Sequence, residues 1–247
     1  MIEISAKYKA WVVISVIVIP LIFFCADQLL SRQQHQEVME KLQEMEELWS
    51  KSAEDTNFQD YNIYESSSPT ATKPPTIIDS SVLIDESSFA IYKTISLSGD
   101  GYAVGTKFKP LWNPDGRVHY LLDISNGLEN NRVSLFTENN FLKLRIYQED
   151  GTETTIKSRI DDWQNDKWYT TEIKWHNPTG NLFLDVNGAN VAKASLGELE
   201  MNLDEARLFL GSNMNGGNQA DGYFDYIYVR KFVYPEPTVI VGAEESA

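Results

Sequence analysis

Hydrophobic and polar residues alternate along most of the chain after Ile77. In one such run, Leu142, Leu144 and Ile146 are separated by a lysine and an arginine. A period of two is typical of a strand that buries one face. Asn187-Gly188 separates two further runs and favours the positive φ angles of a type I′ hairpin turn. The pattern therefore indicates strands joined by tight turns.

About a dozen such runs follow one another without a helical period between them. We therefore predict a mainly β fold, an antiparallel jelly-roll β-sandwich, with a further turn at Asp150-Gly151. The strands are expected near residues 82–84, 89–97, 102–110, 119–124, 132–137, 141–148, 154–160, 168–175, 181–186, 190–195, 207–210 and 223–232.

The first 30 residues have a different pattern. Residues 10–26 are mainly apolar and carry no charge, and two leucines follow at 29 and 30. At about 1.5 Å per residue this run is about 25 Å long, near the lower limit for a membrane span. We predict a transmembrane helix in an N-terminal anchor of residues 1–30, which contacts the lipid bilayer through residues 10–30.

A cleaved signal peptide is the alternative to this anchor. A cleavage site after Ala26 would place Phe24 where a small residue is usual, which favours retention. Lys7 and Lys9 precede the apolar run and acidic residues follow it. The positive-inside tendency then predicts a single-pass protein with a cytoplasmic N-terminus and an extracellular β-sandwich.

Residues 31–50 are expected to form an amphipathic stalk helix. Val38, Leu42, Met45 and Trp49 are spaced 4-3-4, the spacing of a coiled-coil seam. Only about two heptads are apolar, so self-association through the stalk would depend on tethering to a membrane. A single amphipathic helix that lies against another subunit, or against its own domain, is the other interpretation.

A Ser/Pro-rich linker is expected at residues 51–76, because clustered serines and prolines resist regular structure. Within it, Phe58–Tyr64 has enough aromatic character to dock on another surface. We place the β-sandwich at 77–234 and a C-terminal tail at 235–247.

Four segments of the sandwich resemble those of a known family. They are KWY from Lys167, LFLDVNG from Leu182, LFLGSN from Leu208 and ADGYFDYIYV from Ala220. Together they resemble the second half of concanavalin A-like jelly-roll domains of the laminin-G-like branch. The resemblance implies a cell-surface module that binds glycans or proteins, with Trp168 as a structural core residue.

Charge and cysteine content exclude several functions. The chain has 36 acidic and 21 basic residues, a formal net charge of −15, and this disfavours nucleic acid as a partner. Cys25 is the one cysteine, so no intrachain disulfide and no cysteine-based zinc site can form.

Sugar recognition requires an exposed aromatic ring beside polar groups. Trp112, followed by Asn113 and Asp115, and Trp163 are both expected at loop ends. We take these four residues as candidate ligand-binding residues. A ring buried under the rim of the sandwich is the other interpretation of either tryptophan.

Calcium is the common accessory of the family that the chain resembles. Asn213, Asn215, Asn218 and Asp221 form an oxygen-rich loop that could wrap the ion. The loop has one carboxylate, and such Asn/Gly clusters also build ordinary surface turns. Calcium is therefore a candidate cofactor, and no other cofactor is indicated.

The chain is not expected to be an enzyme. Hydrolases of the family carry a Glu-x-Asp-x-x-Glu strand motif, and this string does not occur in the sequence. We predict a membrane-anchored, lectin-like binding or adhesion module that recognises a glycan or a partner protein. The alternative is a structural subunit of an archaeal-type envelope assembly, such as a pilin-like filament, a membrane complex or a viral envelope.

Overall fold

A computed structural model of the protein describes residues 58–64, 70–78 and 80–236. The predicted anchor, stalk, coiled-coil seam and nearly all of the C-terminal tail lie outside these residues. No helix in the described part of the chain is long and apolar enough to cross a membrane.

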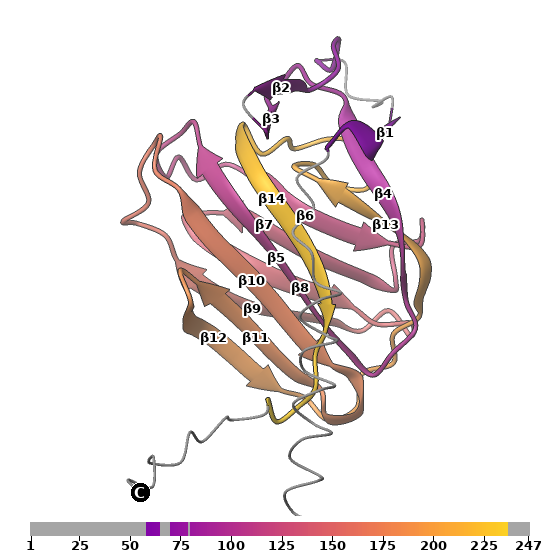
Figure 1. Ribbon diagram of the computed structural model, residues 1–247. Coiled ribbons are helices and arrows are strands. Elements are labelled where there is room, and N and C mark those ends of the chain that lie inside the picture. Colours follow the sequence, from indigo (N-terminus) through magenta and orange to yellow (C-terminus); the bar gives the residue numbers. More distant parts are fainter. Residues whose placement is uncertain (1–57, 65–69, 79, 237–247) are drawn as a thin grey trace, which may run out of the picture. The chain divides into compact units, whose positions relative to one another are not determined.

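The described residues form a sandwich of two seven-stranded antiparallel sheets (Figure 1). We call one the meander sheet, with strand order β1-β4-β13-β6-β7-β8-β9, and the other the pocket sheet, with order β12-β11-β10-β5-β14-β3-β2. The strands are β1 (Asn62–Tyr64), β2 (Thr76–Ile78), β3 (Ser81–Ile84), β4 (Ala90–Leu97), β5 (Gly101–Pro110), β6 (His119–Ser125), β7 (Arg132–Glu138), β8 (Phe141–Tyr147), β9 (Glu153–Arg159), β10 (Tyr169–His176), β11 (Asn181–Val186), β12 (Ala189–Ser195), β13 (Leu203–Leu210) and β14 (Gly222–Lys231).

The predicted mainly β fold and its two-layer sandwich are confirmed. Both hairpin turns are confirmed as well: Asn187 and Gly188 have φ angles of 52° and 76°, and Gly151 has a φ angle of 85°. The amide of Gly151 donates to the carbonyl of Gln148, which closes the turn between β8 and β9.

One strand begins earlier than its pattern predicts. β13 starts at Leu203 rather than near residue 207. The register shifts between Leu203 and Ala206, and Glu205 has a φ angle of 54°. This bulge interrupts the alternation of buried and exposed positions, so the first residues of the strand do not show a period of two.

The sandwich also begins earlier than the predicted boundary at residue 77. Residues Phe58–Asp60 form a 3₁₀ turn, and β1 pairs with β4 at the edge of the meander sheet. Phe58 and Tyr61 are only 5% and 8% exposed and pack in the core. The expected docking of this aromatic segment is confirmed, and its assignment to the linker is corrected. The hydrophobic effect favours burial of the two rings.

The core fills the space between the two sheets. Its largest fully buried side chains include Trp175, Phe108 and Phe224 from the pocket sheet and Leu135 and Leu144 from the meander sheet. Because inward residues fill this space, the alternate residues of each strand form two outer faces. These outer faces can carry polar chemistry.

Candidate functional site

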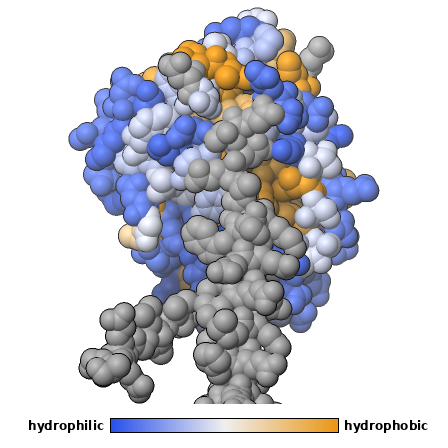
Figure 2. All heavy atoms as spheres, in the orientation of Figure 1, coloured by the Kyte–Doolittle hydropathy of each residue, from blue (hydrophilic) through white to orange (hydrophobic). Residues whose placement is uncertain are grey.

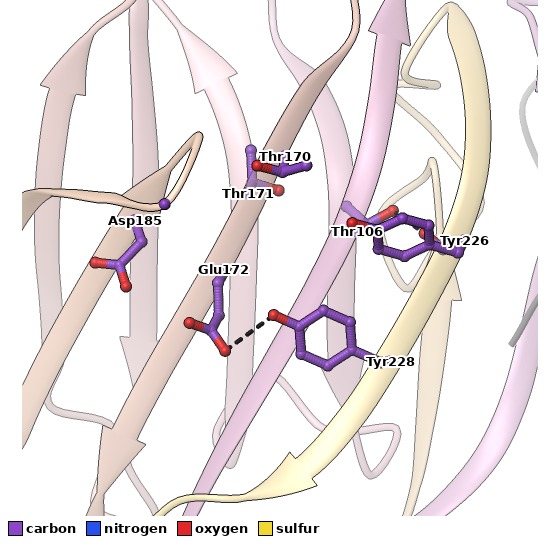
Figure 3. A pocket seen from close by; sticks show the side chains of 8 residues that line it. Thr106, Thr170, Thr171, Glu172, Asp185, Tyr226 and Tyr228 are labelled. Carbon is purple, nitrogen blue, oxygen red and sulfur yellow. Dashed lines mark hydrogen bonds between the residues drawn. The ribbon is translucent and has the colours of Figure 1, made fainter. Parts of the chain in front are cut away.

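A small open pocket lies on the outer face of the pocket sheet (Figure 3). Its volume is about 160 Å³, which is below the usual range for a drug-sized ligand. It is lined by Thr106, Thr170, Thr171, Glu172, Asp185, Gly188, Tyr226 and Tyr228. Four strands and one hairpin turn therefore converge on this place.

Gly105 has no side chain, and the ring of Tyr228 occupies the space that this leaves on β5. Gly105 pairs with Glu172 of β10 on one side and with Tyr228 of β14 on the other. A Cβ atom added at Gly105 would lie 2.3 Å from Cζ of Tyr228. The missing side chain therefore lets the tyrosine cross β5, and its hydroxyl donates to Glu172 over 2.9 Å (Figure 3).

A bulge in β14 directs the second tyrosine of the pocket. The register with β5 shifts between Phe224 and Tyr226. The hydroxyl of Thr106 donates to the carbonyl of Tyr226 over 2.7 Å, and the rings of Tyr226 and Tyr228 stack with centroids 6.3 Å apart. Bulges commonly redirect a side chain beside a functional site.

The two carboxylates of the pocket lie on neighbouring strands. Glu172 of β10 is directly opposite Asp185 of β11. Lys174 bridges them, with Nζ 2.7 Å from Asp185 and 3.5 Å from Glu172. Arg230 contacts the other side of Glu172 at 2.7 Å. The like charges are therefore compensated by two cations.

Glu236, beyond the end of β14, extends this network. It lies 3.5 Å from Lys174 and 3.1 Å from Arg230. Burial opposes the charged forms of Lys174 and Arg230, but the surrounding carboxylates outweigh it and raise the pKa of both cations. Burial, reinforced by Glu172, also raises the pKa of Tyr228. At neutral pH Tyr228 is therefore a hydrogen-bond donor.

Thr171 lines the pocket from a position whose side chain faces the core, since it alternates on β10 with the core residues Tyr169, Ile173 and Trp175. Among the described residues, none forms a hydrogen bond with its Oγ1. A buried hydroxyl without a partner has an energetic cost.

Trp168 continues the site along the sheet. Its ring is half-buried, and Nζ of Lys107 and Nζ of Lys109 lie 5.0 and 5.4 Å from the ring centroid. Nζ of Lys109 also lies 4.4 Å from the ring of Tyr223. Lys107 pairs in register with Thr170 of the pocket, so the ring and the pocket belong to one surface. The side of the molecule seen in Figure 2 is mainly hydrophilic, with apolar residues at its upper end and in a second patch at the right.

The expectation that Trp168 is a core residue is therefore wrong. It directly precedes β10, and Trp175 within that strand is the tryptophan that enters the core, at 1% exposed. Successive side chains of a strand point to opposite faces of the sheet, so the two rings lie on opposite faces. The core tryptophan of this strand is therefore Trp175 and not Trp168, the residue that the resemblance implied.

Trp112 and Trp163 are buried rather than presented to a ligand. They are 8% and 4% exposed. Trp112 donates from Nε1 to the carbonyl of Ala220 and stacks on His119 at 4.5 Å, whereas Trp163 stacks on Tyr169 at 4.4 Å. The expectation of two exposed platforms is corrected: the loops fold the large apolar indoles under the rim.

The polar residues near Trp112 stay at the surface. Asn113 accepts a hydrogen bond from the amide of Asn165 over 3.0 Å, and Asp115 accepts from the amide of Arg117 over 2.9 Å. These contacts hold the loops in place. Neither Asn113 nor Asp115 is among the residues that line the pocket.

The candidate calcium residues Asn213, Asn215, Asn218 and Asp221 lie in the loop between β13 and β14. Oδ1 of Asn213 accepts from the amides of Asn215 and Gly217, over 3.0 and 2.9 Å. Asn218 and Asp221 have φ angles of 51° and 52°. Within the described residues, no group of three or more His, Cys, Asp and Glu side chains could hold a metal ion. Calcium binding stays a prediction.

The pocket was missed in the sequence, although one signal was present. A glycine inside a strand, here Gly105, often marks a close approach of another group. The pairing of Glu172 with Asp185 and Tyr228 depends on register, which the sequence does not display.

The sequence matches no known protein-family model. It is 29% identical over 164 residues to an uncharacterized protein of Archaeoglobus fulgidus, over 64% of this chain and 61% of that protein. The chain thus spans less than two thirds of the length of this curated relative.

The structure is similar to the binding domain of botulinum neurotoxin DC, solved in complex with SialylT. The TM-score is 0.52 at 13% identity, over 69% of this chain and 42% of that chain. The ligand-binding domain of botulinum neurotoxin serotype D, solved with N-acetylneuraminic acid, gives a TM-score of 0.50 at 12% identity, over 69% and 42% of the two chains. At these identities the similarity establishes the fold: this chain contains a two-sheet antiparallel β-sandwich like that of the neurotoxin binding domains.

Proposed function

We propose that this protein is a non-catalytic binding module that holds a hydroxyl-rich saccharide in the pocket of the pocket sheet. The observation that carries the proposal is the convergence of Glu172, Asp185 and Thr170 beside the rings of Tyr226 and Trp168. Carboxylates accept hydrogen bonds from sugar hydroxyls, and aromatic faces pack against the apolar side of a sugar ring.

The dimensions of the pocket fit partial enclosure of a ligand. It opens on a flat sheet face, so a ligand such as one sugar unit of a longer chain would remain partly in solvent. Glu172 already accepts from Tyr228 and Arg230, and Asp185 from Asn190 and Lys174, so a sugar hydroxyl would use the remaining lone pairs of these carboxylates. Two compensated carboxylates and a protonated tyrosine form a recognition surface, and the proposal includes no covalent step.

The fold is consistent with this role. A neurotoxin domain of similar fold was solved in complex with N-acetylneuraminic acid. The proposal includes membership of the concanavalin A-like type, in its laminin-G-like branch. It also includes display on the cell surface through the predicted anchor at residues 1–30, with self-association through the stalk.

A glycan-binding measurement tests the proposal. The full-length protein, kept in solution with a mild detergent, is screened against neutral and acidic glycans, and a neutral glycan that binds is then titrated. Trp168→Ala and Glu172→Gln should each weaken that binding by roughly tenfold, the equivalent of about 1.4 kcal/mol. Glu153→Gln, an exposed change on the other sheet, should leave it unchanged.

Thermal melting of each variant distinguishes a lost contact from a lost fold. If folded Trp168→Ala and Glu172→Gln both bind the neutral glycan as the parent does, the pocket is not the site.

The alternative proposal is a structural subunit of an envelope assembly. Ile77 and Ile78 on β2, an edge strand of the pocket sheet, are 44% and 42% exposed. Exposed apolar residues on a sheet edge favour contact with another chain. Ordered self-assembly that is lost in Ile77→Ser/Ile78→Ser, with no glycan bound in any screen, would favour this alternative.

A further inference from the structure

The outer face of the meander sheet gathers positive charge. By strand alternation, its cations point away from the buried leucines and isoleucines of the same strands. We call this surface the basic face. Its cations are Arg132 of β7, Lys143 and Arg145 of β8, Lys157 and Arg159 of β9, and Arg207 of β13.

Aromatic rings lie beneath these cations. Cζ of Arg145 is 4.9 Å from the centroid of Phe136, and Nζ of Lys157 is 4.7 Å from that of Phe141. Arg207 lies over Tyr92 in the same way, at 5.1 Å. Cation–π contacts hold long side chains in defined positions and so reduce the entropy lost on binding.

A buried ion pair fixes the centre of the face. Arg132 forms two hydrogen bonds of 2.8 and 2.7 Å with Asp123, which is fully buried. Ser134 and the amide of Met214 also donate to this carboxylate, over 2.7 and 2.6 Å. The pair joins β6, β7 and the β13–β14 loop, so the rings and cations around it rest on a rigid support.

Positive charge is incompletely compensated on this face. Glu138 pairs with Lys143, Glu153 lies 3.0 Å from Arg145, and Asp161 lies 2.7 Å from Arg159. Within the part of the chain that the structure describes, no carboxylate lies within 4.0 Å of Lys157 or Arg207. Lys157 is also directly opposite Lys143 in the ladder of β8 and β9. Like charges in opposed positions are unfavourable unless an anion lies between them.

The contrast with the whole chain makes this face distinctive. The protein has a formal net charge of −15, yet among the described residues the six cations of this sheet surface are paired with only four carboxylates, those of Asp123, Glu138, Glu153 and Asp161. The cations extend from β13 to β9 across β6, β7 and β8. Four strand spacings of about 4.8 Å give a width of about 19 Å. A surface of this width fits a polymer with several charges better than a single small anion.

We propose that the basic face binds an acidic polysaccharide, a linear glycan that carries carboxylate or sulfate groups. The lysine and arginine side chains pair with the acidic groups, and the rings pack against the sugar units between them. This site lies on the sheet opposite the pocket and does not depend on the function proposed for the pocket.

Binding to defined polyanions tests the inference. The full-length protein in neutral detergent is titrated with heparin as the sulfated probe, polygalacturonate as the carboxylated probe and dextran as the neutral probe. We expect binding to at least one acidic probe, none to dextran, and affinity that falls as salt is raised. The double variant Lys157→Gln/Arg207→Gln should weaken acidic binding by roughly tenfold or more, because two charge-assisted contacts are lost.

A matched variant controls for net charge. Lys193→Gln/Lys231→Gln removes two exposed cations from the pocket sheet and should leave acidic binding within about twofold of the parent, since distant exposed charges are screened. Equal losses in both double variants would show nonspecific attraction and overturn the inference.

Other outcomes are equally decisive. Absence of binding to both acidic glycans overturns the inference. So does equal affinity for duplex DNA, since the rings would then provide no selectivity for sugar. Binding to phosphatidylserine vesicles alone, lost in Lys157→Gln/Arg207→Gln, would assign the face to an anionic membrane. Glu172→Gln should not change binding of the acidic probes, which keeps this test separate from that of the pocket.

Discussion

At the scale of single residues, glycines and buried polar groups decide how the outer faces are built. Gly105 allows Tyr228 to lie across β5, and Asp123 holds Arg132 at the centre of the basic face. At each position, one residue fixes the place of a side chain that belongs to another strand.

Gly105→Ala should disturb the pocket. The added methyl group would overlap the ring of Tyr228, so the ring must move away from Glu172. We expect a loss of about 1–3 kcal/mol in the free energy of unfolding, typical of overpacking, measured by urea denaturation. Adding Tyr228→Ala to this variant should restore part of the loss, and additive losses would contradict the proposed contact.

Asp85 should make stability depend on acid pH. Partial burial opposes its charge, but hydrogen bonds from Lys73, Ser87 and Ser88 outweigh this and lower the pKa of Asp85 to about 2. A folded pKa below the unfolded value of about 3.9 adds stability above pH 4, which is lost as the pH falls towards 2.

We expect Asp85→Asn to have a free energy of unfolding about 1 kcal/mol lower than that of the parent at pH 7. Between pH 4 and pH 2 this free energy should decline less in the variant than in the parent. Urea denaturation at several pH values measures both effects. Asp162→Asn, an exposed change, serves as the control. Parallel pH curves for Asp85→Asn and the parent would contradict the role of this carboxylate.

At the scale of elements, a short aromatic segment completes the meander sheet. β1 is the edge strand and pairs with β4, and Phe58 and Tyr61 pack in the core. The ring of Tyr64 contacts Phe209 edge-on at 5.4 Å. The segment was expected in a linker because it is short and lies among polar residues.

A fragment of residues 52–247 should be more stable than a fragment of residues 77–247. The shorter one loses two buried rings and leaves one side of β4 unpaired. Loss of a buried phenylalanine side chain alone typically costs about 3–5 kcal/mol. Chemical denaturation of the two fragments gives the comparison. Phe58→Ala in the full-length chain should show a smaller loss in the same direction, and equal stability of the fragments would show that the segment contributes little.

At the scale of the whole molecule, the two outer faces have opposite chemistry. The pocket sheet presents compensated carboxylates, tyrosines and Trp168, whereas the meander sheet presents lysines and arginines over rings. The core separates the two surfaces, so one ligand can occupy each without direct contact.

We therefore expect a neutral glycan and an acidic polysaccharide to bind at the same time. Calorimetric titration of the neutral glycan should give the same Kd, within about twofold, with and without saturating acidic glycan, because sites without a shared two-state element are not coupled. Raising the salt concentration should lower the affinity for the acidic ligand much more than the affinity for the neutral one. Mutual exclusion would show that both ligands use one face.

The sequence by itself determined the local features of this protein: the period of two, the hairpin turns at Asn187-Gly188 and Asp150-Gly151, and the excess of acidic residues. These depend on neighbouring residues, so they can be read along the chain. Only the tertiary structure decided that Trp168 faces outward while Trp112 and Trp163 are buried, and that Glu172 meets Asp185 and Tyr228. The physical reason is that register and loop packing depend on pairing between distant strands, and a strand shifted by one residue would turn every side chain to the other face.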